Sequence, residues 1–210
     1  MAETNKAVFS GRVLSTPRYL TESHDNKIYE FEMESTRNSG IEDRVTVNCP
    51  SYLTEGIEKG DFIKVVGEFR SYNKRISEEK SKLILTLFAQ DICDENLVYE
   101  NEITLDGYIC KPTKFRTTPF GREIADALIA VNRGNGRSDY IPCIFWGHQA
   151  KFLHNKCQVG DGVKLSGRIQ SREYQKYLED GSAVTHTAYE VSVRAFEKKT
   201  EEQREESSSL

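Results

Sequence analysis

The sequence predicts an all-β fold made of two tandem barrels of five short strands, each with one short helix. The first observation is a repeat, because residues 60–71 and 160–171 share the pattern Gly-Asp-x-x-Lys-x-x-Gly-x-x-x-Ser. Such a repeat in a chain of 210 residues indicates two domains of about a hundred residues each. The second observation is period-2 alternation of apolar and polar residues in short runs between turn residues, which is typical of half-buried strands.

In the first half, a turn-rich loop at residues 15–27 and an irregular or short helical crossover at 50–59 separate the runs. The strands are expected at residues 8–14, 28–34, 44–49, 60–71 and 83–88. Each Gly-Asp copy is interpreted as a turn that leads into the fourth strand.

The second half repeats this order with different surface residues. The strands are expected at residues 103–109, 127–131, 139–146, 160–171 and 187–193. The run at 127–131 is apolar at every position and is therefore expected to be covered on both faces. A helix is expected over residues 147–157, with Ala150, Leu153 and Cys157 on one side.

Five strands with a helix between the third and the fourth is the order of the oligonucleotide/oligosaccharide-binding (OB) barrel. The chain is therefore expected to hold two tandem OB-fold barrels, at residues 1–98 and 101–197. Residues 198–210 are rich in glutamate and serine with almost nothing to bury, and are expected to form a disordered acidic tail.

Composition restricts the class of protein. No apolar run approaches the length of a membrane span and the amino terminus has no signal-peptide core, so a cytoplasmic location is expected. The five cysteines form no Cys-x-x-Cys pair and are expected to be buried reduced thiols. The formal charge of −4 does not exclude nucleic acid, because a binding groove needs only a local basic path.

No catalytic constellation is present in the sequence. There is no phosphate-binding loop, no dinucleotide-binding glycine pattern and no nucleophile elbow. The order Cys143, His148, His154, Cys157 fits no common zinc spacing. The chain is therefore expected not to be an enzyme and to carry neither cofactor nor metal.

Several segments of the second half occur in one order that is far more specific than any single motif. They are Ala-Val-Asn-Arg at 130–133, Asp-Tyr at 139–140, Ile-Phe-Trp-Gly at 144–147, Val-Gly-Asp at 159–161 and Gly-Arg-Ile-Gln-Ser-Arg-Glu-Tyr at 167–174. Through these segments residues 103–196 resemble the bacterial single-stranded DNA-binding protein (SSB) family. The first half looks like a degenerate relative of the same domain.

The resemblance implies sequence-nonspecific binding of single-stranded DNA during replication, recombination and repair. In that family bases stack on aromatic side chains, which is worth roughly 1–3 kcal/mol per base, and cations contact the phosphates. The aromatic residues at the matching positions are Tyr140, Trp146 and Tyr174, with Tyr177 close by in the next loop. The matching cations are Arg133, Arg168 and Arg172. The alternative interpretation is that Tyr140 and Trp146 are core or subunit-interface residues, as aromatic residues in strands usually are.

The first half departs from the family pattern at the stacking positions. Arg44, Pro50 and Lys74 stand where the second half has Tyr140, Trp146 and Tyr174, and Tyr72 lies nearby. This half is therefore expected to contribute mainly charge to the DNA-binding surface. The residues expected to do so are Arg44, Arg70, Lys74 and Arg75.

The resemblance also implies partners, namely single-stranded DNA and a second copy of the chain in a homodimer with four OB domains. The acidic tail suggests replication or repair proteins as further partners, although its Ser-Ser-Ser-Leu tip lacks the proline and aromatic residue of the family. Two alternatives remain open: a replication or primosome accessory protein that acts through protein contacts, and a single-stranded RNA-binding chaperone.

Overall fold

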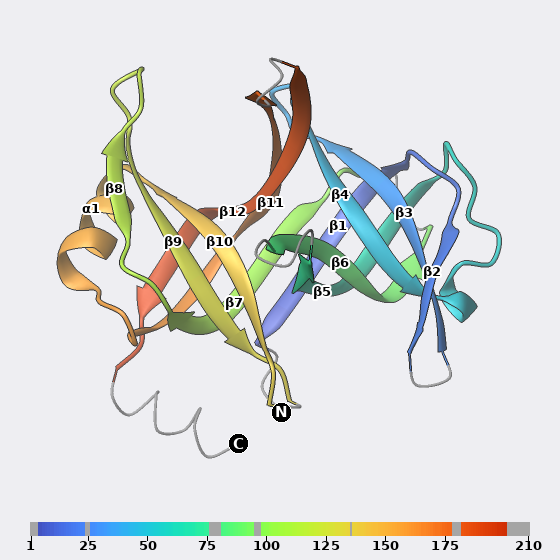
Figure 1. Cartoon of the computed structure of the whole chain (residues 1–210), viewed down its shortest axis with the longest axis horizontal. Coiled ribbons are helices and arrows are strands. Elements are labelled where there is room, and N and C mark those ends of the chain that lie inside the picture. Colours follow the sequence, from blue (N-terminus) through green and yellow to red (C-terminus); the bar gives the residue numbers. More distant parts are fainter. Residues whose placement is uncertain are drawn as a thin grey trace.

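In the part of the chain that the structure describes, twelve strands form one continuous, mainly antiparallel sheet that closes into two barrels (Figure 1). The structure, a computed structural model, describes residues 4–23, 26–75, 81–94, 98–134, 136–177 and 182–200. The N-terminal half contains β1 (Asn5–Val13), β2 (Arg18–Ser23), β3 (Asn26–Thr36), β4 (Glu42–Pro50), a 3-10 turn η1 (Ser51–Leu53), β5 (Phe62–Arg75) and β6 (Ser81–Cys93). The C-terminal half contains β7 (Asn101–Ile109), β8 (Lys114–Thr117), β9 (Glu123–Asn132), β10 (Ser138–Trp146), the helix α1 (Gly147–Lys156), β11 (Gly162–Tyr177) and β12 (Ala183–Lys198).

Both halves have the same strand pairing. In each, the third long strand pairs in parallel with the last strand, as β4 with β6 and β10 with β12. Pairing of β1 with β3 and of β7 with β9 closes the two barrels. This confirms the prediction of an all-β chain with two OB-fold barrels.

The two barrels are joined through their first strands and are related by a pseudo-two-fold axis. Strand β1 pairs antiparallel with β7, and Ala7 lies opposite Ile103, the residue that corresponds to it in the other half. Equivalent side chains make equivalent bonds on the two sides of this axis. The Asn5 amide exchanges two hydrogen bonds with the backbone of Phe69, at 2.9 and 3.0 Å. The Asn101 amide does the same with Ile169, at 2.7 and 2.8 Å.

The core follows from the predicted alternation of apolar residues. Phe9, Phe31 and Phe69 are fully buried in the N-terminal half and Phe145 in the C-terminal half. The helix α1 covers the C-terminal barrel with Ala150 and Leu153, both fully buried, and Cys157 packs against the same core. The predicted helix and its apolar side are therefore confirmed.

Each Gly-Asp copy forms the expected turn before a strand. Gly60 and Gly160 have positive φ angles of 104° and 91°, which only glycine adopts without strain. The Asp61 carboxylate accepts the N–H of Glu58 at 2.8 Å, and the Asp161 carboxylate accepts the N–H of Gln158 at 2.9 Å. The first residues of the shared motif therefore build the turn that leads into β5 and β11.

Several element predictions were wrong. Part of the loop expected at residues 15–27 is the strand β2, and the short strand β8 has no counterpart among the predicted elements. The run at 127–131 was expected to be covered on both faces, but only Ala127, Ile129 and Val131 are buried, while Leu128 and Ala130 are half-buried. Strand β9 pairs with β7, β8 and β10, and a barrel strand has one face towards the core and one towards the outside, so an apolar run need not be covered on both faces.

The two halves differ most in the crossover before the Gly-Asp turn. Nine residues separate Pro50 from Gly60, whereas thirteen separate Trp146 from Gly160. The shorter crossover forms only the three-residue turn η1, and the longer one forms α1. Among its described residues, the N-terminal barrel therefore has no helix equivalent to α1.

The last strand of the C-terminal half continues almost to the end of the described residues. Strand β12 reaches Lys198, and Lys199 is 7% exposed with its ammonium paired to Asp106. Residues 201–210, where most of the acidic tail was predicted, lie outside the described residues.

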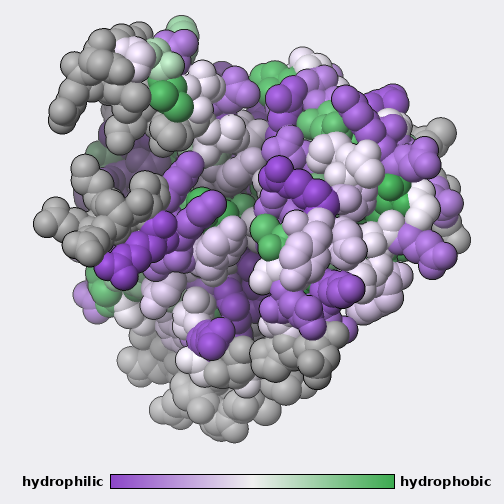
Figure 2. Space-filling model, turned by 45° about the vertical axis from the view of Figure 1, so that its right-hand side comes forward, coloured by the Kyte–Doolittle hydropathy of each residue, from purple (hydrophilic) through white to green (hydrophobic). Residues whose placement is uncertain are grey.

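Among the residues that Figure 2 colours, most of the visible face is hydrophilic and the hydrophobic residues lie in separate spots. Within the described residues, no helix has the length and hydropathy needed to cross a bilayer.

Candidate nucleic-acid interface

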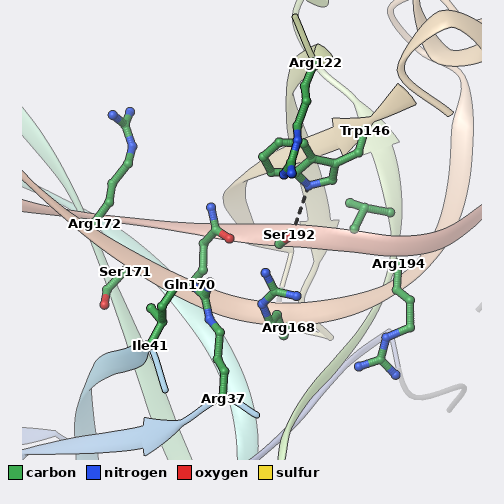
Figure 3. A pocket seen from close by; sticks show the side chains of 11 residues that line it. Arg37, Ile41, Arg122, Trp146, Arg168, Gln170, Ser171, Arg172, Ser192 and Arg194 are labelled. Carbon is green, nitrogen blue, oxygen red and sulfur yellow. Dashed lines mark hydrogen bonds between the residues drawn. The ribbon is translucent and has the colours of Figure 1, made fainter. Parts of the chain in front are cut away.

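A groove of about 600 Å³ lies where the C-terminal barrel meets the β3–β4 turn of the N-terminal half. Arg37 and Ile41 reach it from that turn, and the other side chains come from the C-terminal half (Figure 3). The lining residues are Arg37, Ile41, Arg122, Trp146, Arg168, Gln170, Ser171, Arg172, Ser192, Val193 and Arg194. Five of these eleven residues are arginines and none is acidic, so the groove is suited to an anion.

Trp146 is the aromatic residue among the described residues that line the groove. It is the last residue of β10 and is half-buried. Its indole N–H donates to the hydroxyl of Ser192 on the neighbouring strand β12 at 3.1 Å (Figure 3). This bond holds the ring in one orientation, so that its π-face is preorganised for a planar group.

Arg168 lies beside this ring, because β11 pairs with β12 and places Arg168 opposite Ser192. The Nε atom of Arg168 is buried and has no hydrogen-bond partner among the described residues. Burial lowers the pKa of this guanidinium, and the nearby charge of Arg37 lowers it further. A bound anion would supply the missing hydrogen bond and offset both effects.

The remaining arginines differ in how far their charge is compensated. Arg37 is held by Asp43 at 2.5 Å, and this bond raises the pKa of Arg37. Arg194 lies 3.3 Å from Glu102 and Arg172 lies 3.9 Å from Glu190, and both arginine side chains are exposed. For Arg122, as for Arg168, the described residues provide no ion-pair partner. These two arginines therefore offer the least compensated charge in the groove.

The contact between the β3–β4 turn and β11, which forms one side of the groove, is held by the buried carboxylate of Asp43. Asp43 is fully buried and accepts the backbone N–H of Ser171 at 3.3 Å, while the N–H of Arg44 donates to the Ser171 hydroxyl at 2.8 Å. Since Asp43 also binds Arg37, it fixes the β3–β4 turn against β11. Figure 1 shows the β11–β12 hairpin rising beside the tips of β3 and β4.

Tyr140 was predicted to share one strand face with Trp146. Both residues do alternate onto the same face of β10, but the buried Ile144 lies between them and Tyr140 does not line the groove. Six strand residues span about 20 Å. Tyr140 is 42% exposed and its backbone N–H donates to the Ser71 hydroxyl at 2.7 Å. It therefore forms a separate exposed aromatic site.

Arg133 and Arg70, both expected to contact phosphate, are paired with an acidic residue of the protein itself. The guanidinium groups of both bind the fully buried carboxylate of Asp139, and Arg133 also donates to the Ser71 carbonyl at 3.0 Å. Arg70 binds Glu68 as well. Their charges are thus largely neutralised, because the junction between the two barrels brings Asp139 of β10 against Arg70 and Ser71 of β5.

The other cations expected from the N-terminal half lie outside the groove. Arg44 is exposed and lies 3.6 Å from Glu34. Tyr72, Lys74 and Arg75 occupy the exposed end of β5. The sheet therefore does not bring these residues together with Trp146.

The position equivalent to Arg168 in the N-terminal half is occupied by an acidic residue. Glu68 lies opposite Phe88 in the β5–β6 ladder, just as Arg168 lies opposite Ser192 in the β11–β12 ladder. The exchange of arginine for glutamate reverses the charge at the centre of the equivalent surface. The two halves therefore share a backbone but differ in their electrostatics.

The residues that line the groove agree only in part with those predicted from the sequence. Of the residues predicted from the sequence, Arg168 and Arg172 line the groove together with Trp146, whereas the side chains of Tyr174 and Tyr177 lie outside the described part of β11. Sequence reasoning missed Arg37, Ile41, Arg122 and Arg194. Only Arg194 had a local signal, since it alternates with Ser192 along β12. Phe120 was also missed, although it is 92% exposed and precedes Arg122 by two residues.

Comparison with known sequences matches residues 100–205 to the single-strand binding protein family, which is 106 of 210 residues. The chain belongs to the single-strand binding protein family. A relative named single-stranded DNA-binding protein 3, from Streptococcus agalactiae, is 34% identical over 96 residues, which cover 43% of this chain and 70% of the relative. The single-stranded DNA-binding protein of Oceanobacillus iheyensis is 36% identical over 40% of this chain, but only 55% of its own length is matched.

The family match lies in the C-terminal half, whereas a structural similarity extends over both halves. The single-stranded DNA binding protein from Thermus aquaticus superposes with a TM-score of 0.74 at 20% identity, covering 93% of each chain. At this identity the similarity shows the fold, and it supports the arrangement of two OB barrels in one chain.

Proposed function

We propose that the chain binds single-stranded DNA without sequence preference, by stacking bases on Trp146 and holding phosphates with the surrounding arginines. The observation that carries the proposal is the buried Nε of Arg168, which has no hydrogen-bond partner among the described residues and lies beside a fixed indole ring and four other arginines of the groove. Stacking uses the π-face that every base has, and arginine recognises the phosphate that every nucleotide carries.

The C-terminal half is the main binding half in this proposal. It holds Trp146 and Arg168, whereas the N-terminal half has Pro50 and Glu68 at these positions. Exposed aromatic residues extend the surface at two points, Tyr140 on β10 and Phe120 in the β8–β9 turn. A single DNA strand that contacts Trp146, Tyr140 and Phe120 would cross the outer face of the C-terminal barrel.

The test is a titration of tryptophan fluorescence with oligo-dT at two salt concentrations. Trp146 is the single tryptophan of the chain, so the signal reports on the groove alone. Strong quenching that weakens as salt rises supports the proposal, because phosphate contacts release counterions. Absence of quenching contradicts it and favours the accessory-protein alternative. Tighter binding of oligo-rU than of oligo-dT would indicate the RNA-binding alternative instead.

The biological setting follows from the family and is part of the proposal. We propose a non-enzymatic role in protecting single strands during replication, recombination and repair, in a cytoplasmic protein of two OB domains, residues 1–98 and 101–197. The assembly is a homodimer with four OB domains, and light scattering that gives a stable monomer contradicts it. The acidic tail is also proposed to recruit partner proteins. Deletion of residues 200–210 should then abolish the pull-down of these partners and leave the affinity for DNA unchanged.

A further inference from the structure

A second hollow, of about 560 Å³, lies at the end of the N-terminal barrel that η1 only partly covers. Its apolar wall comes from the crossover and from the facing ends of β5 and β6, with Leu53, Ile57, Phe62 and Ile92. Tyr52 lies at the rim and is 69% exposed. This hollow plays no part in the proposed strand-binding groove.

The C-terminal half shows which structure covers the equivalent surface. Ile92 lies opposite Val65 in the β5–β6 ladder, and Phe196 lies opposite Leu165 at the equivalent place in the β11–β12 ladder. The ring of Phe196 packs edge-on against Phe152 of α1, with 5.8 Å between the ring centroids. One barrel therefore carries a helix on this surface, and in the other the crossover is four residues shorter and forms no α-helix.

The charge of the hollow indicates what would occupy it. Glu55, Asp61 and Asp94 stand among its lining residues, which include no lysine or arginine. The helix α1 has the complementary charge, since it contains Lys151 and Lys156 and no acidic residue. The tail at residues 201–210 is predominantly acidic and would be repelled.

We propose that this hollow is a docking site for a short cationic amphipathic helix of a partner protein. Its apolar side chains would contact Leu53, Ile57 and Ile92, and its lysine or arginine residues would pair with Glu55 and Asp94. Asp61 is less available, because its carboxylate already accepts the N–H of Glu58. The mode is that of a helix in a groove, with the apolar wall supplying affinity and the carboxylates supplying orientation.

The probe is a peptide with the sequence of residues 147–156, blocked at both ends, because it has the required chemistry. Binding is measured by chemical-shift changes of the ¹⁵N-labelled full chain. We expect changes at Ile57, Ile63 and Ile92. The double variant Glu55→Lys with Asp94→Lys is expected to bind the peptide roughly twofold to thirtyfold more weakly, the effect of two exposed ion pairs. A peptide with Lys151→Glu and Lys156→Glu is expected to restore binding to this variant.

A matched control carries Glu173→Lys with Glu197→Lys, which makes the same charge change at exposed positions of the C-terminal half. It is expected to bind the original peptide as the unmodified protein does. Quenching of Trp146 by oligo-dT verifies that each variant is folded. Three results overturn the proposal: no shift changes in the hollow, equal loss in the control variant, or conversion of a dimer to monomers by Glu55→Lys with Asp94→Lys. The last result would make a second copy of the chain the occupant.

Discussion

The carboxylate of Asp139 in the C-terminal half accepts the backbone N–H of Ser71 in the N-terminal half at 2.5 Å. Ser71 is the last residue of the repeated Gly-Asp motif, and its counterpart Ser171 binds Asp43 across the same pseudo-two-fold axis. The shared motif therefore has two structural tasks. Its Gly-Asp turn begins a barrel strand, and its serine fastens one barrel to the other.

The Asp139 contact is expected to be important for stability. Replacement of Asp139 by Ala leaves the guanidinium groups of Arg133 and Arg70 without their shared buried partner. We expect the free energy of unfolding in urea to fall by roughly 3 kcal/mol, the lower end for a broken buried pair, because both arginines are partly exposed. Asp43→Ala leaves only Arg37 unpaired and should cost less. Equal losses for the two variants would contradict this account of the contact.

Stacking on Trp146 is expected to provide a large part of strand affinity. Trp146→Ala should weaken binding of labelled oligo-dT by roughly 1–3 kcal/mol, as measured by fluorescence anisotropy. Trp146→Phe keeps a smaller π-face but loses the bond to Ser192, and an intermediate affinity is expected. If Trp146→Ala binds as tightly as the unmodified chain, the groove is not the binding site.

The salt dependence of binding should separate free from neutralised arginines. Arg168→Gln is expected to reduce the slope of log K against log salt concentration by about 0.7, the value for one phosphate contact on a single strand. Arg70→Gln should change the slope less, because Glu68 and Asp139 already bind that guanidinium. If Arg70→Gln changes the slope more than Arg168→Gln does, the N-terminal half rather than the C-terminal half provides the main phosphate contacts.

The triple variant Arg70→Ala, Lys74→Ala and Arg75→Ala measures what the N-terminal half contributes. If the end of β5 contacts phosphate, this variant flattens the salt dependence with little effect on base preference. Lys74 is exposed at this end and would be responsible for part of the effect. An unchanged slope of log K against log salt concentration would indicate that the DNA strand contacts only the C-terminal half.

Buried thiols should make the protein less stable in alkali. Burial raises the pKa of Cys49 to about 12 and also raises the pKa of Cys143. A raised pKa means that the folded state keeps a proton that the unfolded state releases above its ordinary thiol pKa of about 8.5. This stability is therefore complete at neutral pH and is lost as the pH rises from about 9 towards 12.

Urea unfolding at a series of pH values measures this effect. Cys49→Ala and Cys143→Ala should each reduce the dependence of the unfolding free energy on pH in the alkaline range. Cys93→Ala, at the half-buried end of β6, is the control. Unchanged pH dependence in both core variants would exclude the thiols as its source.

Local patterns in the sequence determined the architecture and part of the site. Alternating runs, turn glycines and the repeat predicted two OB barrels, because strand formation and turns depend on nearby residues. Trp146 and Arg168 could be proposed because they lie on segments that resemble a known family. The helix α1 was predicted from the spacing of Ala150 and Leu153.

Only the tertiary structure decided which residues act together. Arg37 and Arg122 reach the groove from turns that lie far from Trp146 in the sequence. Arg70 is not a free cation, because it forms an ion pair with Asp139 of the other half. These relationships depend on sheet register and on the β1–β7 pairing, which bring together residues 60 to 130 positions apart. No local pattern carries that information, so equivalent positions in the two halves could acquire opposite charge while the fold stayed the same.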